Sequence, residues 1–358
     1  MLHRSWVEID INTVVSNYNI YKQQLKSSQK IMAVVKADGY GHDAVKVSLK
    51  LQEAGCNDFA VSNIDEAKQL RIAGINGQIL ILGYTPISSV GELLKYDITQ
   101  TLISEEYAFA LKGRGVKAQF AVDTGMNRVG IDADDIVKCE MIIRKYFSEY
   151  RLTGIFTHLC VADDFKENQF TSEQIDKFKQ LTERIYDLNL PYIHCLNTAG
   201  GLYHQLFGSM VRLGISLYGL RPNYENKLPV GIKPALKWKS VIAMTKEVLP
   251  GETIGYGRTY RAERKMTVAT IPTGYADGFN RALANRGCVF INGKRANVVG
   301  SVCMDMIMVD ITGIEVNFED EVELIGDRYT ADDMAHDVGT IGYEIVCDIG
   351  KRVERVFL

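Results

Sequence analysis

Short apolar runs alternate with amphipathic stretches of helical length from about residue 10 to residue 220. The runs are IMAVVK, DFAVS, QILILG, DITQTLIS, AQFAVDTG, LTGIFTHL, YIHCLN and VRLGISLYG. Each run and the helix beside it form a unit of roughly 25 to 30 residues, and repeated units of this kind build a parallel sheet. Eight units within about 210 residues favour a closed (β/α)8 TIM barrel, an α/β fold, over an open sheet.

The stretch 171–189 illustrates the helical pattern between two of these runs. Ile175, Phe178 and Leu181 begin an apolar face that repeats at steps of three and four residues. Thr171 and Gln174 have the spacing of a capping box. The sequence therefore predicts an amphipathic helix that begins near Thr171.

The pattern changes between Pro229 and Pro234, after which short β-like segments with Gly and Asn turns follow. The tripeptide NGK at 292–294 predicts a hairpin. We expect the barrel to span 8–228 and a mostly β C-terminal domain to span 229–358. The N-terminal segment 1–7, with the strand-like SWVEID, is expected to join the second domain and to tie the chain ends together.

Composition excludes several classes of function. The formal net charge of -3 is mild and no basic run alternates with aromatic residues, so neither nucleic acid nor an anionic membrane is an expected partner. The seven cysteines are scattered without a CxxC pair, which predicts reduced thiols in a cytoplasmic protein and no metal site. No secretory leader and no membrane-spanning run is evident in the 358 residues.

Polar residues at the carboxyl ends of barrel strands are the candidates for chemistry. These ends supply Lys36 with Tyr40, the segment 123–128, His158, Asn197 with Thr198, and the segment 212–214. No cluster of carboxylates appears among them, which disfavours a Mg²⁺ site or a glycosidase pair.

Lys36 follows five apolar residues. A lysine at a strand end is usually a surface residue, but burial lowers the pKa of an amine, and a neutral amine forms a Schiff base with an aldehyde. Gly214 and Ile215 present backbone N–H groups at a late barrel loop, a common phosphate site, and Thr198 adds a hydroxyl. A lysine for an aldehyde together with a phosphate site suggests pyridoxal 5′-phosphate (PLP) as the cofactor, so we expect the barrel at 8–228 to be the PLP-binding domain.

Arg212 lies between these two features in the expected barrel. Because a guanidinium stays protonated, it disfavours a second proton on the pyridine nitrogen and makes the ring a weaker electron sink. The carbanion formed after Cα–H removal is then short-lived, which favours reprotonation over transamination. Without Lys36, Arg212 reads as an ordinary ion-pair arginine.

Nine stretches together resemble the alanine racemase family of PLP enzymes. They are VVKADGYGHD, VDTGMNRVG, GIFTHLCVADD, HCLNTAGGL, VRLGISLYG, IGYGRTY, PTGYADGFNR, GSVCMDMIMVD and TIGYEIVC, in family order. The resemblance covers nearly the whole chain. It implies a barrel, a β-rich domain and a head-to-tail homodimer whose active sites are shared between subunits, with D-amino acids supplied for peptidoglycan.

The resemblance also implies roles for particular residues. Lys36 and Tyr256 of the partner subunit would act as two bases on opposite faces of the substrate, Lys36 for the D- and Tyr256 for the L-enantiomer. His158 would lie between that tyrosine and Arg212. The cofactor-binding set would be Lys36, Tyr40, His158, Asn197, Thr198, Arg212, Gly214, Ile215 and Tyr343. Arg128 and the Met304 N–H would bind the substrate carboxylate, and the entry corridor would be lined by Tyr275, Arg281, Asp305 and Ile341.

Some positions depart from the family pattern. Ala121 occupies the place of a lysine that is carbamylated in many members, so a chloride or another acid is expected to replace its charge beside Arg128. Ser301 stands where a corridor arginine is usual. These departures resemble the racemase domains of serine/alanine racemases linked to vancomycin resistance, which are fused to a membrane domain. In those enzymes serine preference is associated with an asparagine at the position of Tyr343, so we expect L- and D-alanine as substrates first and serine second.

Two alternatives remain open at this point. A PLP decarboxylase on the same barrel would use an acidic partner at the pyridine nitrogen, which Arg212 disfavours. A PLP carrier protein without catalysis would lack the β-rich half and the tyrosine of the GYG motif.

Overall fold

Eight parallel strands form the first sheet of the computed structural model, which describes residues 4–358. Around the sheet the strand order is β10-β2-β3-β4-β5-β6-β8-β9. The strands are β2 (Lys30–Val34), β3 (Asp58–Val61), β4 (Gln78–Ile81), β5 (Thr99–Leu102), β6 (Lys117–Asp123), β8 (Arg151–Phe156), β9 (Tyr192–His194) and β10 (Met210–Leu213), and the two-residue β7 (Ile131–Asp132) pairs with β6. Backbone hydrogen bonds from Ser209 N to Ile193 O (2.8 Å) and from Arg212 N to Leu196 O (3.0 Å) bring the two end strands together. The barrel expected from the sequence is therefore confirmed.

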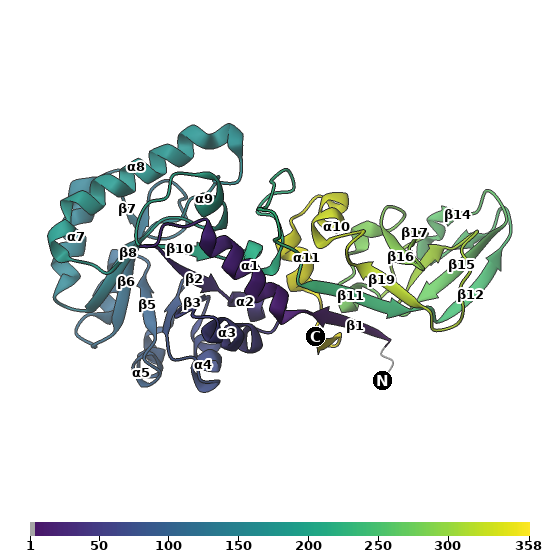
Figure 1. The fold of residues 1–358 in the computed structure, drawn as a ribbon, viewed down its shortest axis with the longest axis horizontal. Coiled ribbons are helices and arrows are strands. Elements are labelled where there is room, and N and C mark those ends of the chain that lie inside the picture. Colours follow the sequence, from purple (N-terminus) through teal and green to yellow (C-terminus); the bar gives the residue numbers. More distant parts are fainter. Residues whose placement is uncertain (1–3) are drawn as a thin grey trace.

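Helices cover the outside of the barrel (Figure 1). They are α1 (Ile11–Gln23), α3 (Ala44–Glu53), α4 (Ile64–Ile72), α5 (Val90–Lys95), α6 (Glu105–Leu111), α7 (Ile136–Phe147), α8 (Asn168–Arg184) and α9 (Thr198–Tyr203). Most begin at an Asp, Asn or Ser whose side chain accepts a hydrogen bond from a backbone N–H of the first turn, as Asn63 does from Glu66 N at 3.0 Å. These caps define where each helix leaves its loop.

Helix α8 corrects the capping box expected at Thr171. The helix begins at Asn168, and Thr171 is buried within its first turn. Gln174 is fully buried, accepts a hydrogen bond from Cys160 N (3.1 Å) and donates one to His158 O (3.2 Å). Gln174 therefore supports the loop after β8 rather than capping its own helix.

The second sheet has nine strands, mostly antiparallel, in the order β12-β15-β18-β17-β16-β19-β11-β1-β20. Their bounds are β1 (Ser5–Ile9), β11 (Leu236–Val241), β12 (Met244–Val248), β15 (Met266–Ile271), β16 (Cys288–Ile291), β17 (Lys294–Val298), β18 (Ile307–Asp310), β19 (Glu321–Ile325) and β20 (Glu354–Phe357), with the short pair β13 (Thr253–Ile254) and β14 (Tyr260–Arg261) beside them. Asn292 and Gly293, with φ values of 51° and 75°, form the predicted hairpin turn between β16 and β17. The mostly β character of this half is confirmed.

Strand β1 lies between β11 and β20 in this second sheet, antiparallel to β11 and parallel to β20. The Trp238 indole N–H donates to Ser5 Oγ at 2.9 Å, so the pairing is supported by side chains as well as backbone. Strand β1 is thereby joined to the C-terminal strand β20, and it extends to Ile9, beyond the end of the expected segment 1–7. Residues 1–3 of the segment 1–7 lie outside the described residues.

Figure 1 shows the barrel and the β-rich half side by side, with α10 (Ala331–Val338) and α11 (Gly342–Asp348) between them. Helix α11 contacts the loop after β2 very closely, since a Cβ on Gly41 would lie 2.4 Å from Val346 O. Helix α11 therefore forms one wall of the space above the barrel strands. Among residues 4–358, no helix combines the length and apolarity that a membrane crossing requires.

Candidate active site

A left-handed turn follows strand β2 and carries Lys36 at its start. Ala37, Asp38, Gly39, Tyr40 and Gly41 all have positive φ, between 52° and 80°. This turn is the segment α2 (Lys36–Tyr40). Left-handed backbone costs a residue other than glycine about 1–2 kcal/mol, and three of the five carry a side chain. The two glycines of ADGYG therefore relieve only part of the strain, and the surrounding structure must hold the rest.

Local contacts hold much of this turn. Gly39 N donates to Val35 O (2.9 Å) and Gly41 N to Ala37 O (3.0 Å). Asp38 Oδ1 accepts from Ala44 N (3.0 Å), the first residue of α3. As a result Lys36 and Tyr40 both face the centre of the barrel mouth.

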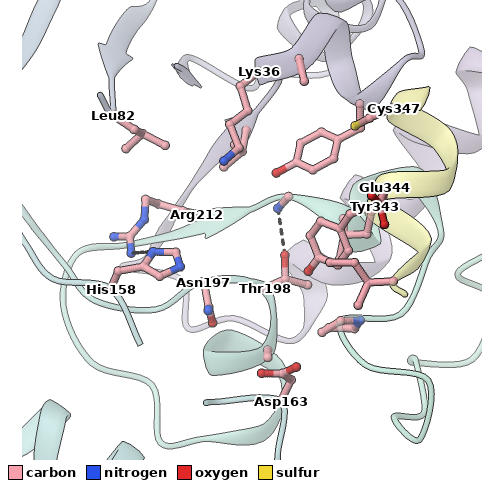
Figure 2. A pocket seen from close by; sticks show the side chains of 18 of the residues that line it. Lys36, Leu82, His158, Asp163, Asn197, Thr198, Arg212, Tyr343, Glu344 and Cys347 are labelled. Atoms are coloured by element: carbon pink, nitrogen blue, oxygen red, sulfur yellow. Dashed lines mark hydrogen bonds between the residues drawn. The ribbon is translucent and has the colours of Figure 1, made fainter. Parts of the chain in front are cut away.

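A cavity of about 610 Å³ lies at this mouth, between the barrel and α11. Figure 2 shows Lys36 pointing into it, with Arg212 and His158 to one side. Thr198 and Tyr343 lie on the other side. All nine residues of the expected cofactor-binding set line it: Lys36, Tyr40, His158, Asn197, Thr198, Arg212, Gly214, Ile215 and Tyr343.

Arg212 is 3% exposed and projects from β10 between two histidines. Its guanidinium donates to His194 Nδ1 (2.6 Å) and to His158 Nδ1 (3.2 Å). Further hydrogen bonds go to the backbone oxygens of Thr157 (2.7 Å) and Cys195 (3.2 Å). Because a guanidinium only donates, both Nδ1 atoms must be acceptors, and each neutral ring carries its proton on Nε2. Burial lowers the pKa of Arg212 to about 10, so it remains charged at neutral pH.

The amine of Lys36 and the ring of His158 are both shifted toward their neutral forms. Burial lowers the pKa of Lys36, and the positive charge of Arg128 lowers it further. Burial also lowers the pKa of His158 well below its usual value, with Arg212 and Arg128 adding to the effect. A lysine of this kind can act as a nucleophile or a base near neutral pH.

Thr198, Gly214 and Tyr40 form a narrow polar cradle at the other side of the cavity. Gly214 N donates to Thr198 Oγ1 at 2.9 Å. A Cβ on Gly214 would lie 3.1 Å from Tyr40 Oη and 3.6 Å from Thr198 Oγ1, so a side chain there would fill the cradle. Asn197 caps α9 by accepting from Gly200 N (2.8 Å), which fixes the loop that bears Thr198.

A smaller cavity of about 290 Å³ adjoins Lys36 and is lined by Ala121, Arg128 and His158 among others. Ala121 leaves room where a longer side chain would project. The one carboxylate in its lining, Asp123, accepts hydrogen bonds from Gly125 N (2.9 Å) and Asn127 N (3.1 Å) of its own loop. The guanidinium of Arg128 and this carboxylate are therefore two side chains of opposite charge in the lining, and the carboxylate is bound to its own loop.

Five predicted site residues do not line these cavities: Tyr256, Tyr275, Arg281, Met304 and Asp305. They belong to the β-rich half, and Tyr256 and Met304 are 77% and 52% exposed. Ser301 Oγ donates to Tyr256 O (2.9 Å), so the serine supports the tyrosine's turn. In Figure 1 the neighbouring strand β14 lies at the end of the molecule away from the barrel.

Two features of the site were missed by sequence reasoning. His194 is fully buried inside the barrel and links Arg212 to Gln119, whose Oε1 lies 2.8 Å from His194 Nε2. The available signal was that His194 is a polar residue at an inward-facing position of the short strand β9. Asp163 and Cys347 also line the large cavity, but only the folded chain brings their loop and helix to it.

The fold and the cavity define a class: a β/α-barrel enzyme with a lysine and an arginine at the strand ends, joined to a β-rich domain. Family models agree, since the alanine racemase N-terminal domain matches residues 9–222 and the alanine racemase C-terminal domain matches residues 235–357. The chain belongs to the alanine racemase family. Within residues 4–358, no group of three or more His, Cys, Asp or Glu side chains is placed to hold a metal ion.

Individual relatives match over nearly their full lengths. The alanine racemase of Halothermothrix orenii is 41% identical, with 99% of this chain and 96% of that protein covered. The alanine racemase of Clostridium difficile has a solved structure that is similar with a TM-score of 0.91 at 35% identity, covering 100% of this chain and 96% of that one. The Bartonella henselae alanine racemase, solved with covalently bound pyridoxal phosphate, has a TM-score of 0.90 at 30% identity, covering 99% and 100%.

Proposed function

We propose that this chain interconverts L- and D-alanine with PLP held on Lys36, and that its D-alanine serves peptidoglycan. The observation that carries the proposal is the large cavity, in which the Lys36 amine faces a buried guanidinium and a polar cradle. The family assignment supports the same reaction.

The residues of the cavity fit PLP. The cradle beside Gly214 has room for a phosphate only because that position lacks a Cβ. Tyr40, Thr198 and Tyr343 offer hydroxyls to it and Ile215 offers its backbone N–H, with Asn197 holding the loop. The Gly214 N–H donates to Thr198 Oγ1 in this structure and would turn from it to the phosphate. Lys36 would hold the aldehyde, and Arg212 would face the pyridine nitrogen. When bound, PLP supplies a ring that withdraws electrons from Cα and eases removal of its proton.

Racemisation needs one base on each face of Cα. The Lys36 amine, with its lowered pKa, is suited to hold or deliver a proton on one face. We assign the other face to Tyr256 of a second copy, because Tyr256 in its own chain lies outside the cavity and is largely exposed. Lysine would serve D-alanine and tyrosine L-alanine.

His158 is suited to support that tyrosine. Arg212 donates to its Nδ1, so its Nε2–H is the free donor. A donor aimed at a phenolate oxygen favours the charged form and lowers the pKa of a tyrosine. The fixed charge of Arg212 also keeps His158 neutral.

The carboxylate of the substrate is assigned to Arg128 and to the Met304 N–H of the second copy. Arg128 lines the smaller cavity next to Lys36 and forms no hydrogen bond or ion pair with any residue in 4–358, so its charge is available. We also propose that a chloride or a small acid occupies the space beside Ala121. The entry would be lined by four exposed residues, Tyr275, Arg281, Asp305 and Ile341.

Serine is proposed as a second substrate, and the chain is proposed to work as a homodimer in the cytoplasm. The homodimer follows from the exposed Tyr256, which completes a site only in another copy. The serine activity rests on the departures from the family pattern at Ala121 and Ser301.

Borohydride trapping tests the proposed function. Reduction of the purified protein with PLP should fix a pyridoxyl group on Lys36, found by peptide mass spectrometry, with L-to-D alanine conversion measured in parallel. Lys36→Ala should abolish both results. Lys30→Ala, at the opposite end of the same strand β2, is the matched control and should change neither. A Lys36→Ala protein that still racemises alanine would overturn the assignment.

A further inference from the structure

Glu66, near the start of α4, joins two loops at the barrel mouth. Its Oε1 accepts a hydrogen bond from Ala37 N at 2.8 Å. Its Oε2 accepts from Ser62 N at 2.8 Å and from Ser62 Oγ at 3.1 Å. One carboxylate therefore ties the turn after β2 to the loop after β3.

The amide that Glu66 binds is the first one of the left-handed turn. Ala37 has φ 52° and ψ 48°, which is unfavourable for alanine. Asp38, the next residue of the turn, is tied to the start of α3, because its Oδ1 accepts from Ala44 N (3.0 Å). A turn of this strain persists only where the surroundings determine its shape, and these two carboxylates are placed to do so.

Lys36 directly precedes this amide, and Tyr40 ends the same turn. Both side chains line the large cavity. A shift of the turn would therefore move the amine and the phosphate-side hydroxyl together. We propose that Glu66 is a positioning residue, which clamps the left-handed turn so that Lys36 and Tyr40 face the cofactor; this rests on the proposed binding of PLP.

The charge of Glu66 and its hydrogen bonds should have opposite effects on the affinity for PLP. Burial and Arg128 lower the pKa of Lys36, whereas Glu66 and Cys347 raise it. Removing the charge of Glu66 would increase the neutral fraction of the amine and so favour its reaction with an aldehyde. A role through charge thus predicts tighter PLP binding after neutralisation, and a clamp predicts weaker binding.

Glu66→Gln separates these two roles. A carboxylate accepts through both oxygens, whereas an amide accepts through one and directs its NH2 group at the other backbone donor. Losing one charge-assisted hydrogen bond should weaken PLP binding by about tenfold or more. The dissociation constant is read from the visible absorbance of bound PLP, titrated into the full-length protein.

Asp65→Asn is the matched control, because Asp65 is the preceding residue of the same helix and is exposed, with only Lys68 beside it at 3.8 Å. It removes the same charge without touching the turn, and should leave PLP binding unchanged. Glu66→Asp keeps the charge but shortens the reach by one methylene, so the clamp predicts weaker binding for it as well. The aspartate variant also serves if the glutamine variant is too unstable to purify.

Hydrogen–deuterium exchange of the PLP-free chain gives a second, cofactor-independent result. Exchange of the amides of 37–41 should become several-fold faster in Glu66→Gln, and that of the Ser62 amide, which also donates to Glu66, should rise with it. Exchange should remain unchanged in the rest of the barrel and throughout Asp65→Asn. Unchanged exchange at 37–41, tighter PLP binding, or wild-type behaviour of Glu66→Asp would each overturn the clamp. If the wild-type protein fails to trap PLP on Lys36, the proposed function fails, while the exchange comparison still decides whether Glu66 holds the turn.

Discussion

Arg212 is a buried charge without an acid beside it. Its hydrogen bonds go to carbonyl oxygens and to the Nδ1 atoms of His158 and His194. These partners are dipoles and carry no net negative charge. The positive field of the guanidinium toward the cavity is therefore not cancelled by a carboxylate. Burial lowers the pKa of both histidines and the field of Arg212 lowers it further, so both rings stay neutral. The same field suits a ring nitrogen that is to remain unprotonated.

Buried neutral histidines predict how stability depends on pH. Burial lowers the pKa of His42 to about 4 and those of His158 and His194 well below 6.5. The unfolded chain takes up these protons near pH 6.5 and the folded chain does not, so the free energy of unfolding should fall as pH drops below 6.5. Each histidine contributes about 1.4 kcal/mol per pH unit over the window in which only its unfolded form is protonated.

Denaturant unfolding of the cofactor-free protein at pH 6.5, 5.5 and 4.5 measures this slope. His42→Phe is the comparison, since His42 is completely buried and packs on the Tyr218 ring at 4.6 Å. The histidine-dependent slope should fall by about a third in the variant. Equal slopes in the two proteins would show that His42 is not buried uncharged.

The side chain of Tyr343 is expected to set the preference for alanine over serine. It lies on α11 and its ring centroid is 5.9 Å from that of Tyr40, at the wall of the large cavity. Tyr343→Asn should raise the kcat/KM of L-serine relative to that of L-alanine, because a smaller amide leaves room for a hydroxymethyl group. Tyr343→Phe keeps the ring and should keep the ratio. A ratio that is the same in all three proteins would place the specificity elsewhere, with Ser301 as the next candidate.

The left-handed turn of α2 is the element that most shapes the site. Glycine belongs in such backbone, and Ala37 is exposed, so its methyl group adds strain without packing. Ala37→Gly should therefore leave the free energy of unfolding unchanged or raise it by up to about 1 kcal/mol. Ala110→Gly, at an exposed position of the right-handed helix α6, should lower it by about 1 kcal/mol. Urea unfolding compares the two, and a similar loss in both variants would contradict the strain assigned to the turn.

Helix α8 shows where sequence patterns mislead at the scale of an element. The apolar face at Ile175, Phe178 and Leu181 is buried as its spacing predicted. The start was placed three residues late, because Thr171 and Gln174 satisfy the pattern of a cap and are instead buried against the barrel. A capping box describes local hydrogen bonds only, and a tertiary partner such as Cys160 N competes for the same side chain.

At the scale of the whole molecule, the two bases that we propose lie on different halves of the chain. Lys36 belongs to the barrel mouth, whereas Tyr256 is exposed on the β-rich half. Our proposed division at 228/229, with segment 1–7 joined to the second domain, places one base on each side of the boundary. A second copy arranged head to tail would complete two equivalent sites.

Subunit mixing tests this arrangement. Tyr256→Phe should keep PLP on Lys36 but lose L-to-D conversion, and Lys36→Ala should be inactive. Equal mixtures of the two, allowed to exchange subunits, should regain about a quarter of wild-type activity, because half of the dimers would carry one intact site. Each variant incubated alone is the control. No recovery in a mixture that size-exclusion chromatography shows to be dimeric would contradict a shared site.

The sequence by itself determined the barrel, the β-rich half and the residues around Lys36, because these rest on patterns that are local along the chain. Strand runs, turn glycines and short motifs are each read within about ten residues. Only the tertiary structure decided the left-handed turn, the hydrogen bonds from two loops to Glu66, the His194–Arg212 contact and the exposure of Tyr256. The contacts of Glu66 and His194 join segments that are far apart in the chain, and the exposure of Tyr256 depends on how the two halves pack. The left-handed turn is local, but its strain is held by residues outside it, so local conformational preference does not determine it.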